Sequence, residues 1–343
     1  MHCRLTNKKN TYFIAEIGVN HNGNMKLAKR MILAAKKAGA DAVKFQTFKA
    51  DNLAIPDTLK VKYQKKNTPK KQSHYEMLKS LELSDSQHRI LYRFCKREKI
   101  EFLSTPYDVS SAKFLNALGC KIFKTASADI VDLSLHEYLA KTNKIVLIST
   151  GMSNFKEINH CINIYKKFKN RKFILLHCVS NYPCSDKSIN MMVLKKIKNS
   201  FNCAVGYSDH GHGNEASILS VAFGAKVIER HFTINKNLPG PDQSTSLLPK
   251  DFSAMVKSVR KSELIIGKPI KYCQPEEKEM LKISRKSLTI LKIINKNEII
   301  KKDHLTLKRP GKGLYEKELK NIIGRRAKKK LKINYQIRYK DLI

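Results

Sequence analysis

Polar and ionisable side chains recur in this sequence at the ends of short apolar runs. The first set consists of two lysines and four hydroxyl residues: Lys44, Lys124, Thr105, Ser127, Ser149 and Ser208. Cations and hydroxyl donors that surround one opening bind a phosphate or a carboxylate. Taken singly, each hydroxyl would more often cap a loop, and each lysine would more often protect a sheet edge. The predicted anion site therefore depends on the whole set coming together.

Two histidines, His210 and His231, follow two such runs, with Asp209 directly before the first and Glu229 two residues before the second. Neutral imidazoles at a polar opening bind a divalent metal together with water and substrate oxygens. A lone histidine would more often be structural. For a pair at neighbouring strand ends, metal binding and a structural role are equally well supported. Glu16 would act there as a general base or pair with Lys44. Asp242 would face the opening or belong to an ordinary turn.

Apolar runs typical of strands alternate with longer amphipathic stretches over the first 270 residues. Strands that alternate with helices indicate parallel βαβ units, and eight units are the number that closes a (β/α)8 TIM barrel. An open doubly wound sheet is the alternative, but no G-x-G-x-x-G follows the first strand. The predicted strands span residues 12–17, 42–46, 101–104, 121–124, 145–149, 173–178, 204–208 and 226–232.

The polar residues above lie at the carboxyl ends of these strands, where a TIM barrel carries its active site. A closed barrel has no sheet edge, so Lys44 and Lys124 are expected to point into the barrel mouth and to need an anionic partner. The long stretch 49–84, between the second strand and the next predicted barrel helix, is a predicted functional segment because loops of that length are uncommon.

The apolar pattern changes after Gly267, where a polar stretch precedes a second region of alternation. We predict a barrel domain over residues 1–268, a linker over 269–283 and a small, mostly β module over 284–343. About 60 residues suffice for an independent module. This module is expected to contain short strands, turns and a helix near residues 317–323.

The chain of 343 residues has 67 Lys+Arg against 29 Asp+Glu, a formal net charge of +38. Such a charge invites a nucleic-acid hypothesis. The excess is lysine, however, whereas bidentate phosphate and base contacts favour arginine, and the lysines are spread along the whole chain. We therefore expect no nucleic-acid partner.

The cysteine spacing and the lengths of the apolar runs indicate the cellular compartment in which the protein is expected. Eight cysteines include no C-x-x-C pair, which argues against a disulfide framework or a zinc site. No apolar run approaches the roughly 18 residues that span a bilayer, and the N-terminus has no apolar signal region. A cytoplasmic protein with reduced thiols and no membrane partner is expected.

Several ordered motifs resemble those of the sialic acid synthase family, and the resemblance covers essentially the whole chain. The segment 307–311 (LKRPG) is similar to that family's antifreeze-like (SAF) domain. The resemblance implies a barrel joined to this small domain, and condensation of phosphoenolpyruvate with an N-acylated aminohexose aldehyde. The products would be a nine-carbon 2-keto acid and phosphate. The barrel motifs are 13–23 (FIAEIGVNHNG), 43–48 (VKFQTF), 103–106 (LSTP), 149–152 (STGM), 206–210 (GYSDH), 228–233 (IERHFT) and 240–242 (GPD).

The resemblance also implies a role for each site residue. His210 and His231 would ligate a divalent metal, Mn²⁺ or else Mg²⁺ or Co²⁺, acting as a Lewis acid on the aldehyde oxygen. Glu16 would complete the catalytic residues, and a domain-swapped homodimer would bring Arg309 of one subunit to the sugar in its partner. Phosphoenolpyruvate would be held by Lys44, Thr105, Lys124, Ser127, Ser149, Ser180 and Ser208. The sugar would contact Gln46, Asn67, Tyr182, Glu229, Asp242 and Arg309.

The sequence departs from the family pattern near the site. Asp129 stands where many relatives have glutamate, Ser180 where some have asparagine, and Gln243 where histidine is frequent. None of these departures removes a residue that the chemistry requires.

The natural sugar is judged from segments 63–68 (YQKKNT) and 240–242. Both resemble the neuraminate and legionaminate branches more than the pseudaminate branch. We predict an N-acetylneuraminate synthase that uses N-acetylmannosamine. The alternative is an N,N'-diacetyllegionaminate synthase that uses 2,4-diacetamido-2,4,6-trideoxymannose.

Two other classes of function compete with a synthase. An inactive barrel that acts as a basic polyanion-binding protein would bind DNA or heparin in a salt-sensitive way and would not need the histidines. A metal-dependent aldolase would need either no phosphate site or a lysine that forms a Schiff base. The presence of both histidines and of every phosphate-side group favours the synthase.

Overall fold

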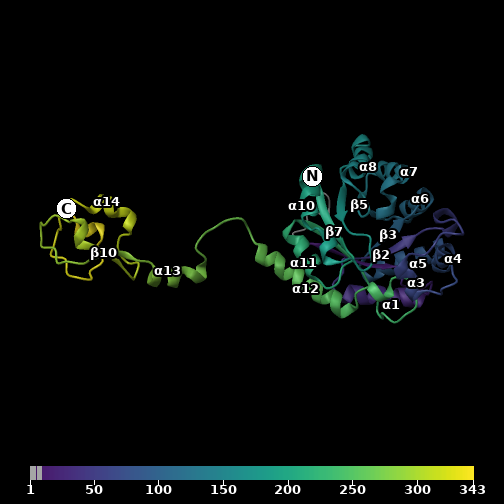
Figure 1. Cartoon of the computed structure of the whole chain (residues 1–343), viewed down its shortest axis with the longest axis horizontal. Helices are drawn as coiled ribbons and strands as arrows, with labels where there is room; N and C mark the ends of the chain where they lie inside the picture. The colour runs from purple at the N-terminus through teal and green to yellow at the C-terminus, as the bar shows by residue number, and fades with distance from the viewer. Residues whose placement is uncertain (1–4, 6–9) are drawn as a thin grey trace. The chain divides into compact units, whose positions relative to one another are not determined.

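The computed structural model describes residue 5 and residues 10–343. Contacts between residues divide the chain into two compact units, Met1–Gly267 and Lys268–Ile343 (Figure 1). The finer division into barrel, linker and module stays a prediction. Each unit is described by itself.

The larger unit is built on eight parallel strands in the order β3-β2-β1-β8-β7-β6-β5-β4. The prediction of a TIM-like barrel is confirmed, and every predicted strand lies within two residues of an observed one at each end. The strands are β1 (Tyr12–Gly18), β2 (Ala42–Thr47), β3 (Glu101–Pro106), β4 (Ile122–Thr125), β5 (Ile145–Ser149), β6 (Phe173–His177), β7 (Ala204–Asp209) and β8 (Ala225–His231).

The barrel is nearly closed rather than fully closed. Strands β3 and β4 are neighbours, but no ladder of backbone hydrogen bonds joins them in the part of the chain that the structure describes. The expectation that closure removes every sheet edge is therefore wrong for β4, the strand that carries Lys124. This lysine nonetheless points inward, because its side chain is only 3% exposed.

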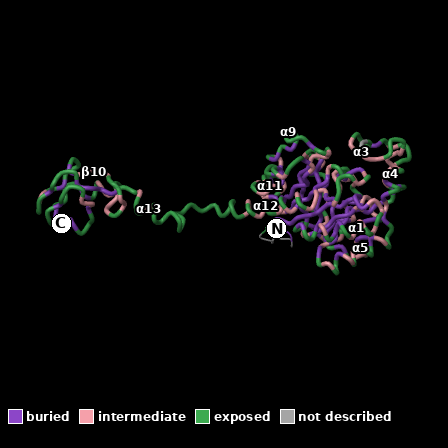
Figure 2. Tube along the Cα trace, turned by 90° about the horizontal axis from the view of Figure 1, so that it is seen from below, coloured by how far each residue is buried: buried purple, intermediate pink, exposed green. Residues whose placement is uncertain are grey.

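Helices cover the outside of the barrel, and the buried part of the chain lies inside them (Figure 2). In α1, for example, Met31, Ile32 and Ala35 are fully buried, and Asn24 caps the first turn by accepting from the backbone N–H of Lys26 and Leu27. None of the described helices is long and apolar enough to cross a membrane. The covering helices are α1 (Met25–Lys37), α5 (Asp85–Glu98), α6 (Val109–Leu118), α7 (Leu133–Lys141), α8 (Phe155–Lys167), α10 (Met192–Phe201), α11 (Glu215–Ala222) and α12 (Pro249–Ile266).

The stretch 49–84, which we call the lid segment, folds into three short helices: α2 (Ala50–Leu53), α3 (Lys62–Asn67) and α4 (His74–Leu81). Four of its buried apolar side chains, Ala50, Met77, Leu78 and Leu81, form a cluster with Val19 and Phe48 that is separate from the main core. The segment is tied to the loop after β8, since Asn67 Nδ2 donates to Ser244 Oγ at 2.6 Å and Gly240 N–H donates to the Asn67 carbonyl at 3.2 Å.

The smaller unit contains a two-stranded antiparallel sheet, β9 (Ser287–Ile290) with β10 (Leu305–Lys308). Its apolar core includes Leu288, Ile290 and Ile294. Helix α13 (Lys278–Ser284) occupies part of the stretch predicted as linker, and the helix predicted near 317–323 is α14 (Leu319–Ile322), preceded by a 3-10 turn.

Candidate active site

A cavity of about 530 Å³ opens at the carboxyl ends of the barrel strands. Nearly all the residues singled out from the sequence line it, and they come from every strand or the loop that follows it. Two predicted residues do not line it, Asn67 and Arg309. Those that do are Glu16, Lys44, Gln46, Thr105, Lys124, Ser127, Ser149, Ser180, Tyr182, Ser208, His210, Glu229, His231 and Asp242.

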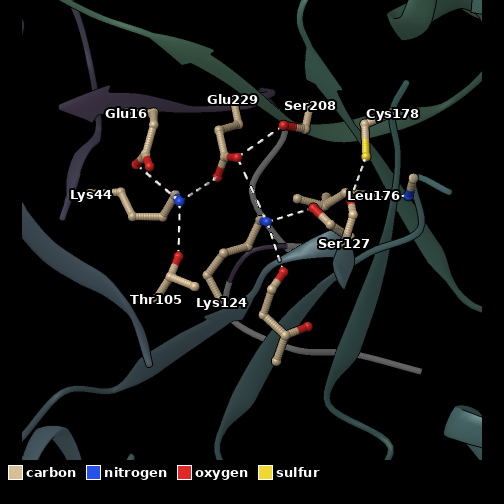
Figure 3. Close-up of polar contacts among 12 residues, drawn as sticks. Glu16, Lys44, Thr105, Lys124, Ser127, Leu176, Cys178, Ser208 and Glu229 are labelled. Atoms are coloured by element: carbon tan, nitrogen blue, oxygen red, sulfur yellow. Dashed lines mark hydrogen bonds and ion pairs between the residues drawn. The ribbon is translucent and has the colours of Figure 1, made fainter. Parts of the chain in front are cut away.

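Two lysines and two glutamates alternate across the cavity floor. Lys44 Nζ lies 2.9 Å from Glu16 Oε2 and 3.7 Å from Glu229 Oε2, and Lys124 Nζ lies 3.7 Å from Glu229 Oε1. Figure 3 shows Glu229 between the two ammonium groups, while Thr105 Oγ1 accepts from Lys44 at 3.0 Å. Strand pairing places Glu16 opposite Lys44, so the alternation follows directly from the barrel register.

Burial and charge act in opposite directions on these groups. Burial raises the pKa of Glu16 to about 7, with Lys44 opposing the shift and Glu229 adding to it. Burial alone would also raise the pKa of Glu229, but Lys124 and Lys44 outweigh it and hold that pKa at about 2. Burial lowers the pKa of Lys124. Glu229 is therefore the fixed anion of the floor, and Glu16 is the carboxyl that can exchange a proton near neutral pH.

Hydroxyl groups surround Lys124 on the β4 to β6 side. Lys124 Nζ donates to Ser149 Oγ at 2.5 Å, and Ser127 Oγ accepts from the Gly151 N–H at 3.1 Å. A Cβ at Gly151 would lie 2.4 Å from Ser180 Oγ and 2.8 Å from Ser127 Oγ. Any residue other than glycine at this position would therefore displace these hydroxyl groups. One cation with several hydroxyl donors is an arrangement that binds phosphate.

The two histidines lie on the wall formed by β7 and β8, with ring centroids 5.7 Å apart. His210 Nδ1 lies 2.7 Å from the Val179 carbonyl, a contact that requires the proton on Nδ1 and leaves Nε2 unprotonated, 3.4 Å from Ser208 Oγ. His231 Nδ1 is buried, lies 3.9 Å from Asp242 Oδ2 and has no hydrogen-bond partner among the described residues. Burial lowers the pKa of His210 to about 4 and, with His210 and Lys44, lowers that of His231 well below its usual value. Both rings are therefore neutral.

Neutral imidazoles with an unprotonated nitrogen fit a divalent metal. In residue 5 and residues 10–343, no group of three or more His, Cys, Asp or Glu side chains is arranged to hold one. A metal between His210 and His231 would thus take its other ligands from water and substrate.

A buried ion pair lies behind the histidines, on the opposite side of β7 and β8. Arg230 Nη1 lies 2.5 Å from Asp209 Oδ2, and both side chains are at most 3% exposed. Arg230 also donates to the Gly211 carbonyl at 3.1 Å, and Ser217 Oγ donates to Asp209 at 2.5 Å. Because side chains alternate along a strand, this pair fixes the neighbouring positions that face the cavity, His210 and His231.

Sequence reasoning did not assign a role to several residues that line the cavity. Tyr63 of α3 donates a hydrogen bond to Asp242, whose pKa burial raises to about 6, and its ring lies 5.1 Å from that of Tyr182. Tyr107 and Asp129 also line the cavity. Both could have been found from the sequence, because Tyr107 lies two residues after Thr105 and Asp129 two residues after Ser127.

The predicted roles of Asn67 and Arg309 stay predictions. The Asn67 side chain donates to Ser244, within the contact that ties down the lid segment. Arg309 is an exposed residue of the smaller unit.

Comparisons with known proteins agree with this architecture. The NeuB family model matches residues 31–271, and the SAF domain model matches residues 285–343. The chain is 41% identical to the N,N'-diacetyllegionaminic acid synthase of Campylobacter jejuni, over 96% of this chain and 99% of that protein. It is also 41% identical to the enzyme of that name from Legionella pneumophila, over 92% and 90%.

The solved structures include a similar protein, the N-acetylneuraminic acid synthetase of Leptospira borgpetersenii, in complex with citrate. It is 33% identical, superposes with a TM-score of 0.70, and covers 79% of this chain and 90% of its own. Because the family model covers most of the chain and relatives match it along nearly its whole length, this protein belongs to the NeuB family of sialic acid and legionaminic acid synthases and carries a C-terminal SAF domain.

Proposed function

We propose that this chain condenses phosphoenolpyruvate with an N-acylated aminohexose aldehyde to give a nine-carbon 2-keto acid and phosphate. The observation that carries the proposal is one cavity in which two buried lysines and a group of hydroxyls lie beside neutral histidines and carboxylates. The lysines and hydroxyls suit the two anionic groups of phosphoenolpyruvate. The histidines and carboxylates beside them suit the aldehyde and the hydroxyl groups of a sugar.

In the proposed reaction, C3 of phosphoenolpyruvate forms a bond to the aldehyde carbon, whose oxygen gains a proton. Water then adds at C2 and loses a proton, and the C–O bond to phosphate breaks as the 2-keto group forms. Glu16, with a pKa of about 7, is suited to take and return these protons. Lys44 and Lys124 hold the anionic substrate, and Glu229 keeps the lysines charged and in place. A divalent metal held by His210 and His231, which we propose to be Mn²⁺, supplies Lewis-acid polarisation of the aldehyde when bound.

The sugar is either N-acetylmannosamine or 2,4-diacetamido-2,4,6-trideoxymannose. The segments compared above are compatible with both. Identity favours the second sugar, because the legionaminic acid synthases are 41% identical to this chain, against 33% for the N-acetylneuraminic acid synthetase. We therefore propose the trideoxy sugar as the natural substrate and N-acetylmannosamine as the second candidate.

The direct test is phosphate release from phosphoenolpyruvate with Mn²⁺ and each sugar in turn. We expect release that requires a sugar and stops with a chelator. His231→Ala should lower kcat by at least about 10³-fold, because a lost metal ligand removes most of the Lewis acidity. The matched control is His160→Ala, since His160 is exposed on α8.

Absence of release with both sugars, from folded and metal-loaded protein, would contradict the proposed function. Salt-sensitive binding to heparin would then favour a polyanion-binding protein.

We also propose a homodimer in which the small unit of each copy brings Arg309 to the cavity of the other. Apolar side chains that are half exposed or more are concentrated around the boundary between the units, and exposed apolar surface of this kind marks an interface. Light scattering should give twice the mass of the 39.3 kDa chain, and a monomer would contradict the proposal. These residues are Leu264, Ile265, Ile266, Ile270, Tyr272, Met280 and Ile283.

A further inference from the structure

The wall that the lid segment contributes to the cavity is largely apolar, unlike the floor. The wall includes Leu53 of α2, Ala54 directly after that helix, and then Leu59 and Val61. Helix α4 adds Met77, Leu78 and Leu81. The cavity thus has a charged floor made by the strands and an apolar wall made by one inserted segment.

The polar side chains of the lid segment that line the cavity are largely engaged already. The Thr58 hydroxyl donates to the Ile55 carbonyl at 2.8 Å, and Tyr63 donates to Asp242. Gln64 Oε1 accepts from the Val61 N–H at 3.2 Å and lies 3.3 Å from Nδ1 of His74, which also lines the cavity. This wall therefore offers few hydrogen bonds to a hydroxyl group of a ligand.

The strand order determines which part of the sugar meets this wall. Lys124 and the hydroxyls on β4, β5 and β6 lie across the barrel from β8, β1 and β2, and the lid segment follows β2 directly. With phosphoenolpyruvate at Lys124 and these hydroxyls, and with Lys44 of β2 reaching it across the floor between Glu16 and Glu229, the sugar occupies the side of the cavity toward the lid segment. Its aldehyde carbon must face phosphoenolpyruvate, so its far end, C4 to C6, extends toward the lid segment.

We propose that the apolar lid wall selects the sugar by its far end, favouring a C6 methyl and a C4 acetamido group over the two hydroxyls of N-acetylmannosamine. This inference rests on the proposed function. A hydroxyl placed against an apolar wall loses its water partners without gaining new ones, whereas a methyl group gains by leaving water. Differences of one such group change kcat/KM by about 10- to 200-fold.

The exposure of Leu59 and Val61 distinguishes a role in ligand contact from ordinary packing. Met77, Leu78 and Leu81 are at most 8% exposed and belong to the apolar cluster of the lid segment, so their presence in the wall is explained by folding. Leu59 is 80% exposed and Val61 53% exposed, and neither belongs to that cluster. Two apolar side chains that line the cavity without supporting the fold are explained by contact with a ligand.

The test compares kcat/KM for the two sugars in three variants. Leu59→Asn and Val61→Thr place a polar group on the wall at nearly constant size, and threonine is also a better N-cap than valine at the start of α3. Ile55→Asn is the matched control, because Ile55 is 73% exposed in the same segment but does not line the cavity.

We expect the wild type to prefer the trideoxy sugar. Leu59→Asn should lower that preference about tenfold and Val61→Thr severalfold, mainly through the kcat/KM of the trideoxy sugar, while Ile55→Asn leaves it within twofold. A wild type that prefers N-acetylmannosamine, or variants that lower both sugars equally, would overturn the selection and leave the proposed synthase standing. Absence of release with either sugar would overturn both.

Discussion

Lys124→Met is expected to lower kcat/KM for phosphoenolpyruvate by about 10³-fold. The ammonium group is 3% exposed and lies among Ser149, Thr125 and Glu229, so it meets an anionic substrate in a desolvated site. Removing one partner of such a charge pair costs about 2–5 kcal/mol, and methionine keeps the length of the side chain. Initial rates of phosphate release against phosphoenolpyruvate concentration give the value, with the larger share expected in KM.

Lys121→Met is the control for this substitution. Lys121 immediately precedes the same strand but is exposed and does not line the cavity, so the variant loses the same charge away from the site. Its kcat/KM should stay within twofold of the wild type. If Lys124→Met loses less than tenfold while its thermal unfolding is normal, Lys124 does not hold the substrate.

Asp209→Ala is expected to destabilise the barrel by about 3–5 kcal/mol. It leaves the Arg230 guanidinium buried with the Gly211 carbonyl as its one remaining partner among the residues that the structure describes, and an uncompensated buried charge has a cost of this size. Urea unfolding followed by circular dichroism measures the change. The loss is large against the roughly 5–15 kcal/mol that stabilises a typical domain.

Two comparison variants test the cause. The Lys141–Glu137 pair on α7 is 2.8 Å long, close to the buried one, but both side chains are about half exposed, so Glu137→Ala should have little effect. Asp209→Leu combined with Arg230→Met removes both charges and should recover most of the stability. Equal costs for Asp209→Ala and Glu137→Ala would show that burial of the pair does not matter.

Much of the barrel could be predicted from the sequence because its strands are buried on both faces and bounded by amphipathic helices. Helices α2 and α3 escaped prediction since four and six residues are too few to show a 3.6-residue period. The missing ladder between β3 and β4 depends on the geometry of the whole barrel, which no local pattern records.

The sequence predicted which side chains line the cavity where those side chains lie at a strand end, while their roles stay predictions. The side chains of Lys44, Glu229 and Ser149 lie on strands, so their places followed from the register. Tyr63 is brought to the site from the lid segment, which is far from it in the sequence, and its contact with Asp242 follows from tertiary packing alone. The proposed place of Arg309 depends on a second copy of the chain, which a single sequence does not describe.

The origin of the lid wall has an evolutionary consequence. The floor of the cavity draws its residues from many strands, so a change in any one of them disturbs the pairing of its neighbours. The apolar wall of the cavity comes from the lid segment, a single insertion between β2 and α5 that has an apolar cluster of its own. Substitutions of the apolar residues in that insertion leave the lysines and glutamates of the floor in place. Substrate preference can therefore diverge between descendants of one ancestral synthase while the carbon–carbon bond-forming chemistry is inherited unchanged.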